Sequence, residues 1–301
     1  MERRRVFVTG GTGFVGRAVV HALSAEGYSV RCLVRRGSER DLRGFEAIER
    51  VEGDILARRG LEDGMAGCDT VIHLVGIIRE RPAAGITFER LHTQGTVRVL
   101  EAAAATGIRR FIHMSALGVR PDAHARYHTT KWAAEEAVRA SGLPWTIFRP
   151  SIIYGRRDGF VSLLAQMTRR LPLVPVIGTG LNRLQPVPVE HVAKGFARAV
   201  ALPGAVKQTY EVGGPDPVTI LELLDLVARA VGRRPRSKIH VPLGLVRTAA
   251  RVLDGFPGFP ITRDQLLMLQ EDSTCDPTPF YSTFDLTPLP LATGLQRMLA
   301  P

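Results

Sequence analysis

Three glycines near the start of the chain restrict its fold more than any other feature of the sequence. They are Gly10, Gly13 and Gly16, which follow the apolar run 6–9 and precede a segment with one apolar face at helical spacing. Gly10 permits a tight turn, Gly13 lets backbone N–H groups approach a phosphate, and Gly16 lets the helix pack on the strand. The pattern predicts a strand, a turn and a helix N-terminus that bind a pyrophosphate. The expected lining residues are Gly10, Thr12, Gly13, Phe14, Val15 and Gly16.

Strands and helices alternate along the first half of the chain. Short apolar runs predict strands at 6–9, 30–34, 71–75, 110–114 and 145–149, and helical patterns fall at 14–26, 94–106 and 128–141. This alternation predicts an α/β fold with a doubly wound parallel sheet of about seven strands and helices on both faces. Ligands of such a sheet bind beyond the carboxyl ends of its strands.

The pattern changes from about Thr209, where a short strand around Tyr210 is followed by helical patterns at 219–231, 242–254 and 262–270. The second of these helices has a broad apolar face, which is more often core than a docking surface for a membrane or partner. We therefore expect a Rossmann-type nucleotide-binding domain over 1–208. A smaller, mostly helical C-terminal lobe over 209–301 would cover the substrate, with contributions from about 155–185.

The first gap between the glycines is one residue longer than in the common G-x-G-x-x-G pattern, and Thr9 precedes it. This Thr-Gly-x-x-Gly-x-x-Gly stretch resembles the short-chain dehydrogenase/reductase superfamily, especially its extended and atypical, epimerase/dehydratase-like members. The resemblance implies a nicotinamide dinucleotide cofactor.

Arg35 and Arg36 follow the second expected strand. Arg35 stands nineteen residues after Gly16, where a site selective for NAD(H) usually places an acid that binds the ribose hydroxyls. A guanidinium suits a 2′-phosphate instead, although one of many arginines could fall here by chance. Since no acid stands between the end of the second expected strand and Glu39, the sequence favours NADP(H), with NAD(H) as the alternative.

Other cofactor contacts are implied by the resemblance at the ends of the third, fourth and sixth strands. Asp54 and Ile55, after the third strand, would touch the adenine. A turn in which Asp54 caps the following helix is a structural alternative that is compatible with this role. The last resembles the family's R-P-x-x-x-Y/F-G element, which lies along the nicotinamide. His73, inside an apolar strand, is interpreted as a core histidine. The residues concerned are Asp54, Ile55, Leu74, Val75, Gly76, Pro150 and Ile152.

Tyr127 and Lys131 form the candidate catalytic pair. Residues i and i+4 lie on one face of a helix, so the phenol and the ammonium can point into the same cleft. A phenol with a pKa of about 10 is a poor base at neutral pH, and a neighbouring ammonium would lower that pKa. Lys131 could also hold the nicotinamide ribose. Ser115, at the end of the fifth strand, is a candidate hydrogen-bond donor to the substrate.

Ala116 and His92 depart from the family pattern. Ordinary extended members carry Ser or Thr at the first position and Asn at the second, and the interval from Ser115 to Tyr127 is short. Several stretches instead resemble bacterial relatives of the nucleotide-binding accessory subunit of respiratory complex I. In that branch NADPH is bound tightly and is thought to be structural. The stretches are 92–96, 113–118, 148–150, 185–187 and 262–266.

Composition narrows the partners of the chain. The net charge is +11, but 36 of the 40 basic residues are Arg, scattered singly or in pairs with no interleaved aromatics, which argues against nucleic acid. Three cysteines fit no metal-ligand spacing, and no signal peptide or membrane-length apolar run is expected. We expect a cytoplasmic protein. An anionic surface, such as the inner face of the membrane, and a respiratory complex both remain candidate partners. Two functions remain: reduction of a carbonyl or quinone-like small molecule, or non-catalytic NADPH binding in an accessory or assembly protein.

Overall fold

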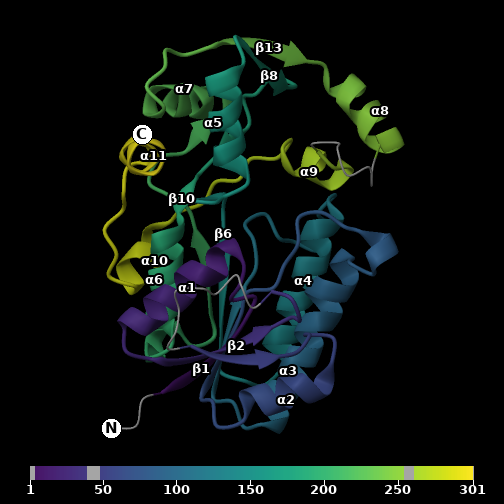
Figure 1. The fold of residues 1–301 in the computed structure, drawn as a ribbon, viewed down its shortest axis with the longest axis vertical. Helices are drawn as coiled ribbons and strands as arrows, with labels where there is room; N and C mark the ends of the chain where they lie inside the picture. The colour runs from purple at the N-terminus through teal and green to yellow at the C-terminus, as the bar shows by residue number, and fades with distance from the viewer. Residues whose placement is uncertain (1–3, 39–47, 254–260, 301) are drawn as a thin grey trace. The chain divides into compact units, whose positions relative to one another are not determined.

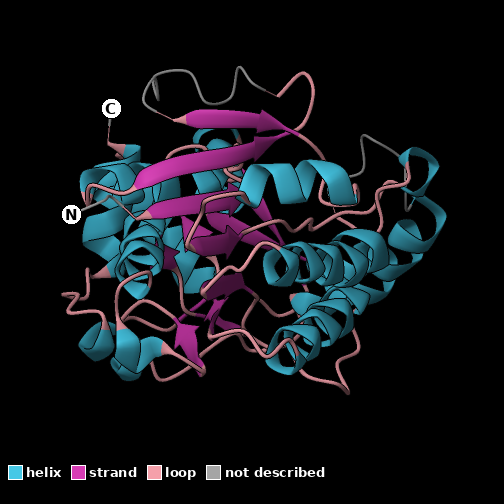
Figure 2. Cartoon of the chain, turned by 90° about the horizontal axis from the view of Figure 1, so that it is seen from below, coloured by secondary structure: helices cyan, strands magenta, loops and turns pink. Residues whose placement is uncertain are grey.

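A seven-stranded sheet forms the centre of the first of two compact units. The computed structural model describes residues 4–38, 48–253 and 261–300. The strand order is β11-β6-β5-β4-β1-β2-β3, and the pairs from β6 to β3 are parallel. Figure 2 shows the strands in magenta and the helices in cyan. The strands are β1 (Arg5–Thr9), β2 (Ser29–Val34), β3 (Glu49–Glu52), β4 (Thr70–His73), β5 (Arg110–Met114), β6 (Trp145–Pro150) and β11 (Gln208–Val212).

Helices of the same unit cover both faces of this sheet (Figure 1). α1 (Phe14–Ala25) packs against α6 (Val189–Ala199), while α3 (Gly95–Ala105) packs between α2 (Arg58–Met65) and α4 (Arg126–Ala140). Strand residues such as Phe7, Val71 and Phe111 are fully buried under the second group. The remaining elements of this unit are short: η2 (Pro82–Ala84), the π-helix η3 (Glu89–Gln94), η4 (Pro203–Ala205) and α10 (Thr278–Thr283).

The second unit comprises Ser151–Pro188, Val212–Pro277 and Thr287–Pro301. Its helix α7 packs against α5 and α11 around a hydrophobic core of its own. Thr219 begins α7 with a capping box, in which its hydroxyl accepts the N–H of Glu222. The helices are α5 (Phe160–Arg170), α7 (Ile220–Ala230), α8 (Leu243–Leu253), α9 (Arg263–Met268) and α11 (Leu291–Leu299). The strand pairs are β7 (Ile153–Tyr154) with β10 (Val187–Pro188), β9 (Arg183–Leu184) with β12 (Val218–Thr219), and β8 (Leu173–Ile177) with β13 (Ser237–Val241).

The predicted fold class is confirmed: a doubly wound sheet precedes a C-terminal part that is mostly helical. The weak third strand forms as β3, and the strand around Tyr210 forms as β11 at the edge of the central sheet, beside β6. The helix expected at 242–254 forms as α8, although Asp254 and the side chains of Ala250 and Val252 lie outside the described residues. Within the described chain, no helix has the length and hydropathy needed to cross a bilayer.

Candidate functional site

The glycine turn between β1 and α1 fits a phosphate. Gly10 has φ +77°, a conformation that favours glycine, and a Cβ on Gly16 would lie 2.1 Å from the Gly10 carbonyl oxygen. Gly13 is the N-cap of α1, and no side chain caps this helix or places an acid in its first turn. Its first N–H groups are therefore open to an anion, which the helix dipole also favours.

The end of β4 lies directly under this turn. The N–H of Leu74 donates to the carbonyl of Thr9 at 3.1 Å, and a Cβ on Gly10 would lie 3.1 Å from the backbone of Leu74 and Val75. The structure thus brings the glycine turn together with the residues expected from the fourth strand. The other expected residues of the turn are half-buried: Thr12, Phe14 and Val15.

Arg35 and Arg36 follow β2 with exposed side chains. Among the described residues neither guanidinium has a carboxylate partner. Glu39, which ends the acid-free stretch, lies outside the described residues.

Asp54 and Ile55 follow β3, where their side chains take different roles. Asp54 Oδ1 accepts the N–H of Leu56 at 2.8 Å, so the carboxylate organises the turn before α2. It does not cap that helix, because the N-cap of α2 is Ala57 and no side chain caps it, so the expected helix-capping role of Asp54 is wrong. Ile55 is buried in the hydrophobic core, where a Cβ on Gly95 would lie 2.5 Å from its side chain. The Ile55 side chain is therefore part of the core between α2 and α3.

Tyr127 and Lys131 lie one turn apart on α4, as the spacing predicts. Lys131 is 1% exposed, and its Nζ donates to the carbonyl of Met114 at the end of β5 at 2.8 Å. A Cβ on Gly76 would lie 3.2 Å from this Nζ, so the end of the Lys131 side chain lies close against the backbone that follows β4. No described group is hydrogen-bonded to the half-buried Tyr127 hydroxyl, which leaves it open to a substrate.

Burial shifts the pKa values of the pair in opposite directions. It raises the pKa of Tyr127 to about 12 and lowers the pKa of Lys131 to about 8, since it disfavours the charged form of each group. The expected lowering of the Tyr127 pKa by Lys131 is absent from this structure, where burial dominates. The phenol is therefore protonated at neutral pH, the state that a proton donor needs.

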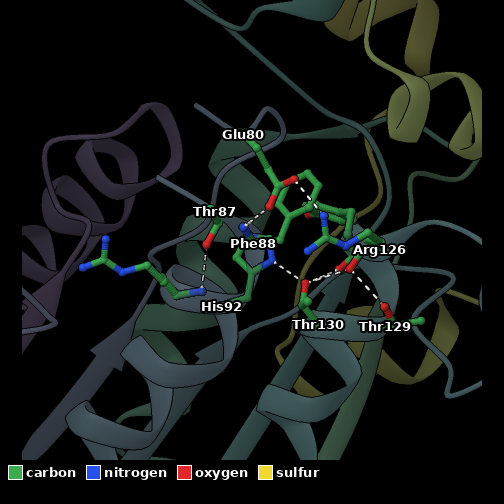
Figure 3. Close-up of polar contacts among 9 residues, drawn as sticks. Glu80, Thr87, Phe88, His92, Arg126, Thr129 and Thr130 are labelled. Atoms are coloured by element: carbon green, nitrogen blue, oxygen red, sulfur yellow. Dashed lines mark hydrogen bonds and ion pairs between the residues drawn. The ribbon is translucent and has the colours of Figure 1, made fainter. Parts of the chain in front are cut away.

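His92 lies beside Tyr127 and is hydrogen-bonded to Thr130, as Figure 3 shows for the second contact. Its Nε2 accepts the N–H of Ile77 at 3.1 Å, which leaves Nδ1 to donate to Thr130 Oγ1 at 3.0 Å. The ring stacks on Phe88 and meets the ring of Tyr127 edge-on, with centroids 5.3 Å apart in both pairs. His92 lies in the π-helix η3, and such segments are frequent at functional sites.

A buried ion cluster of Glu135, Arg149 and Arg139 joins α4 to β6. It was not predicted from the sequence. Glu135 is fully buried and receives two hydrogen bonds from Arg149, at 2.8 and 2.7 Å, and one from Arg139 at 2.5 Å. Burial alone would raise the pKa of Glu135, but the hydrogen bonds from Arg149 and Arg139, together with the nearby Ser115 hydroxyl, lower it. The sequence held one indication of this role: Glu135 stands four residues after Lys131 and therefore lies on the same face of the helix.

Ser115 follows β5 and is 3% exposed. Its hydroxyl has no hydrogen-bond partner among the described residues, but it lies near enough to Glu135 to help lower the pKa of that carboxyl. Pro150 ends β6 and is buried, while Ile152 belongs to the second unit. His73 is a core histidine, as expected: it is fully buried and hydrogen-bonded to Thr9 and Thr96.

Comparisons with known proteins give three informative relatives. Ceramide reductase of Caulobacter vibrioides is 34% identical over 83% of this chain and 78% of that protein. A 4-hydroxy-2-methyl-3-oxo-4-farnesyl-3,4-dihydroquinoline-1-oxide ketoreductase of Stigmatella aurantiaca is 32% identical over 82% and 79%. The mitochondrial NADH-ubiquinone oxidoreductase 40 kDa subunit of Neurospora crassa is 28% identical over 90% and 72%.

The fold is that of solved sugar-nucleotide epimerases. UDP-glucuronic acid 4-epimerase of Bacillus cereus, solved with UDP-glucuronic acid and NAD, superposes with a TM-score of 0.75 at 19% identity and covers 98% of both chains. The family model described as "NAD dependent epimerase/dehydratase family" matches residues 6–213. This match spans the sheet, the glycine turn and the Tyr127–Lys131 pair, so the chain belongs to the NAD dependent epimerase/dehydratase family, whose members bind NAD(H) or NADP(H).

Proposed function

We propose that the chain is an NADPH-dependent reductase of a carbonyl group on an apolar substrate. The observation that carries the proposal is the pair on α4: a protonated phenol open to a ligand, one turn from a buried ammonium anchored on Met114. Two relatives, a ceramide reductase and a farnesyl-dihydroquinoline oxide ketoreductase, are named for reductions of molecules with long apolar chains. Their names support a hydrophobic carbonyl or quinone-like substrate here.

The residues present fit a nicotinamide dinucleotide. The glycine turn would hold the pyrophosphate, and Arg35 and Arg36 a 2′-phosphate, while Lys131 Nζ would hold the nicotinamide ribose with the N–H groups it does not spend on Met114. The bound group would supply a hydride. Asp54, Ile55, Leu74, Val75, Gly76, Pro150 and Ile152 complete the proposed cofactor site.

The proton in the proposed reaction comes from Tyr127. Its Oη would donate a hydrogen bond to the substrate oxygen and pass the proton on as negative charge develops there. Lys131, charged at neutral pH, would stabilise the resulting phenolate. Ser115 would be a second donor to the same oxygen.

Arg35→Asp tests the cofactor preference. We expect NADPH to bind about tenfold more weakly, because one charge-assisted hydrogen bond, worth about 1.5 kcal/mol at an exposed position, is lost. Affinity for NADH serves as the internal control and should not fall. Fluorescence titration of both nucleotides measures this, and a wild-type preference for NADH would refute the assignment of Arg35.

A second candidate function is a non-catalytic NADPH-binding accessory or assembly protein. Two observations favour it. One relative is a subunit of a mitochondrial NADH-ubiquinone oxidoreductase. In addition, Ala116 and His92 stand where ordinary extended enzymes carry other residues. The proposed location is the cytoplasm or the inner face of the membrane. In both proposals 1–208 is the nucleotide-binding domain. The smaller lobe over 209–301, with contributions from about 155–185, covers the substrate in the first proposal and acts as a lid in the second.

The deciding experiment begins with the nucleotide released from the purified, denatured protein. NADPH oxidation is then followed with ketones and quinones of increasing chain length. Oxidation that rises with chain length supports the reductase. Tightly bound NADPH that no member of the panel oxidises supports the accessory protein.

A further inference from the structure

The second unit carries a two-stranded sheet with one face on the core. β8 and β13 run parallel and lie side by side (Figure 1). Side chains along a strand alternate between the two faces of a sheet, and aligned residues of neighbouring strands share a face. Val174 and Val176 are almost fully buried in the core of this unit, so their face is the inner one.

The outer face of this sheet is apolar, although it is exposed. Leu173 and Ile239 are 50% and 52% exposed, and Pro175, aligned with Ile239, is exposed as well. A sheet with one face on the core usually places polar residues on the other face. Here five of the six outward positions are apolar, which indicates a binding surface. The six positions are Leu173, Pro175, Ile177, Ser237, Ile239 and Val241.

Positive charge gathers on the same two stretches of chain. Segments 159–189 and 226–253 hold ten basic residues and no acidic residue, while the net charge of the whole protein is +11. Arg170 immediately precedes the turn into β8, and Arg233 and Arg234 precede β13; all three are exposed. Lys238, one of the ten, does not contribute to the net positive charge of this surface, because it forms an ion pair with Asp225 at 2.5 Å. These exposed arginines stand just before the N-terminal ends of the two parallel strands, and we call them the arginine border of the apolar face.

We propose that this outer face, with its arginine border, docks on a lipid bilayer that contains anionic phospholipids. Apolar side chains of such a surface enter the boundary between headgroups and acyl chains, while long arginine side chains reach the phosphates. Nucleic acid fits less well, since an apolar face offers nothing to a phosphate backbone. Docking goes beyond the proposed reduction and uses none of the residues assigned to the nucleotide, so either proposal can fail without the other.

The test is sedimentation of the full chain with lipid vesicles. We expect binding to vesicles of phosphatidylcholine mixed with phosphatidylglycerol, little binding to phosphatidylcholine alone, and release as salt approaches about 1 M, where screening is strong. Failure to bind the mixed vesicles, or equal binding to both kinds, overturns the proposal.

Two double variants separate the contributions to binding. Arg233→Gln/Arg234→Gln should weaken binding to mixed vesicles about thirtyfold, from two basic residues at the membrane surface. Leu173→Ser/Ile239→Thr should weaken it at least about tenfold through lost apolar contact. The control Arg98→Gln/Lys207→Gln removes the same charge from exposed positions of the first unit and should change binding less than threefold.

If the control and the arginine variant lose vesicle binding to the same extent, binding depends only on net charge. That result would refute a defined docking surface. Light scattering of the wild type and of Leu173→Ser/Ile239→Thr identifies the competing occupant. A wild-type dimer that the variant splits, without vesicle binding by either, would assign the face to a second copy of the chain and reject the membrane. Thermal unfolding confirms that each variant is folded.

Discussion

Tyr127→Phe is expected to lower turnover of a carbonyl substrate by a factor of about 10²–10⁴, the usual contribution of a positioned proton donor. The phenol is protonated at neutral pH, since burial raises its pKa to about 12, and within the described chain no group engages its hydroxyl. Phenylalanine keeps the ring and its contacts with Phe88 and His92. Turnover is measured by NADPH oxidation under saturating nucleotide.

Nucleotide affinity separates this role from a structural one. Tyr127→Phe should leave the NADPH dissociation constant within about threefold, whereas Lys131→Met should weaken nucleotide binding as well as turnover, because Nζ is the proposed ribose contact. A Tyr127→Phe protein that turns over as fast as the wild type would remove Tyr127 from the mechanism. An inactive wild type that still binds NADPH tightly would favour the accessory function.

The part of the site next to the glycine turn was predictable because its constraints are local. A strand, a positive φ at Gly10 and a position where a Cβ would strike the Gly10 carbonyl leave few alternatives to this turn. Tyr127 and Lys131 were predictable for the same reason, since helical spacing alone places them on one face. Local pattern also revealed a strand around Tyr210, but not that it pairs with β6, because pairing partners distant in sequence leave no trace in periodicity.

The supports of the site could not be read from the sequence. In the sequence Glu135 resembles an ordinary surface residue of a helix. Its role depends on Arg149 of β6, which forms two hydrogen bonds with it in the folded chain. His92 was noted only as a departure from a family pattern, yet it holds Ile77 and Thr130 through its two ring nitrogens. Such roles depend on which strand ends meet, and that is decided by the assembled sheet. The same holds for the pKa of Tyr127, where burial outweighs the neighbouring charge.

Stability is expected to fall steeply below about pH 6.5. Burial, reinforced by the charge of Lys131, lowers the pKa of His73 to about 3 and that of His92 to about 2, and it lowers the pKa of His113 well below its usual value. These rings stay neutral in the folded state while the unfolded chain takes up protons, so their contribution is present above the unfolded pKa and lost as pH falls. Three such groups remove roughly 4 kcal/mol per pH unit, against a total stability of about 5–15 kcal/mol.

Urea unfolding at half-unit steps from pH 8 to pH 5 measures this loss, and His113→Leu assigns it. Within the described residues both ring nitrogens of His113 lack hydrogen-bond partners, so leucine removes a titrating group without breaking a bond. The pH slope should fall by about one quarter, since four such histidines titrate in the unfolded chain, while stability at pH 8 changes by less than about 1.5 kcal/mol. Half-buried His191, with a pKa of about 4, also stays neutral in the folded state over most of this window and adds a part of similar size to the slope. The carboxyl of Glu135 titrates below this window. The exposed His21→Gln control should leave the slope unchanged, and a wild-type stability independent of pH from 8 to 5 would show that the buried rings accept protons in the folded state.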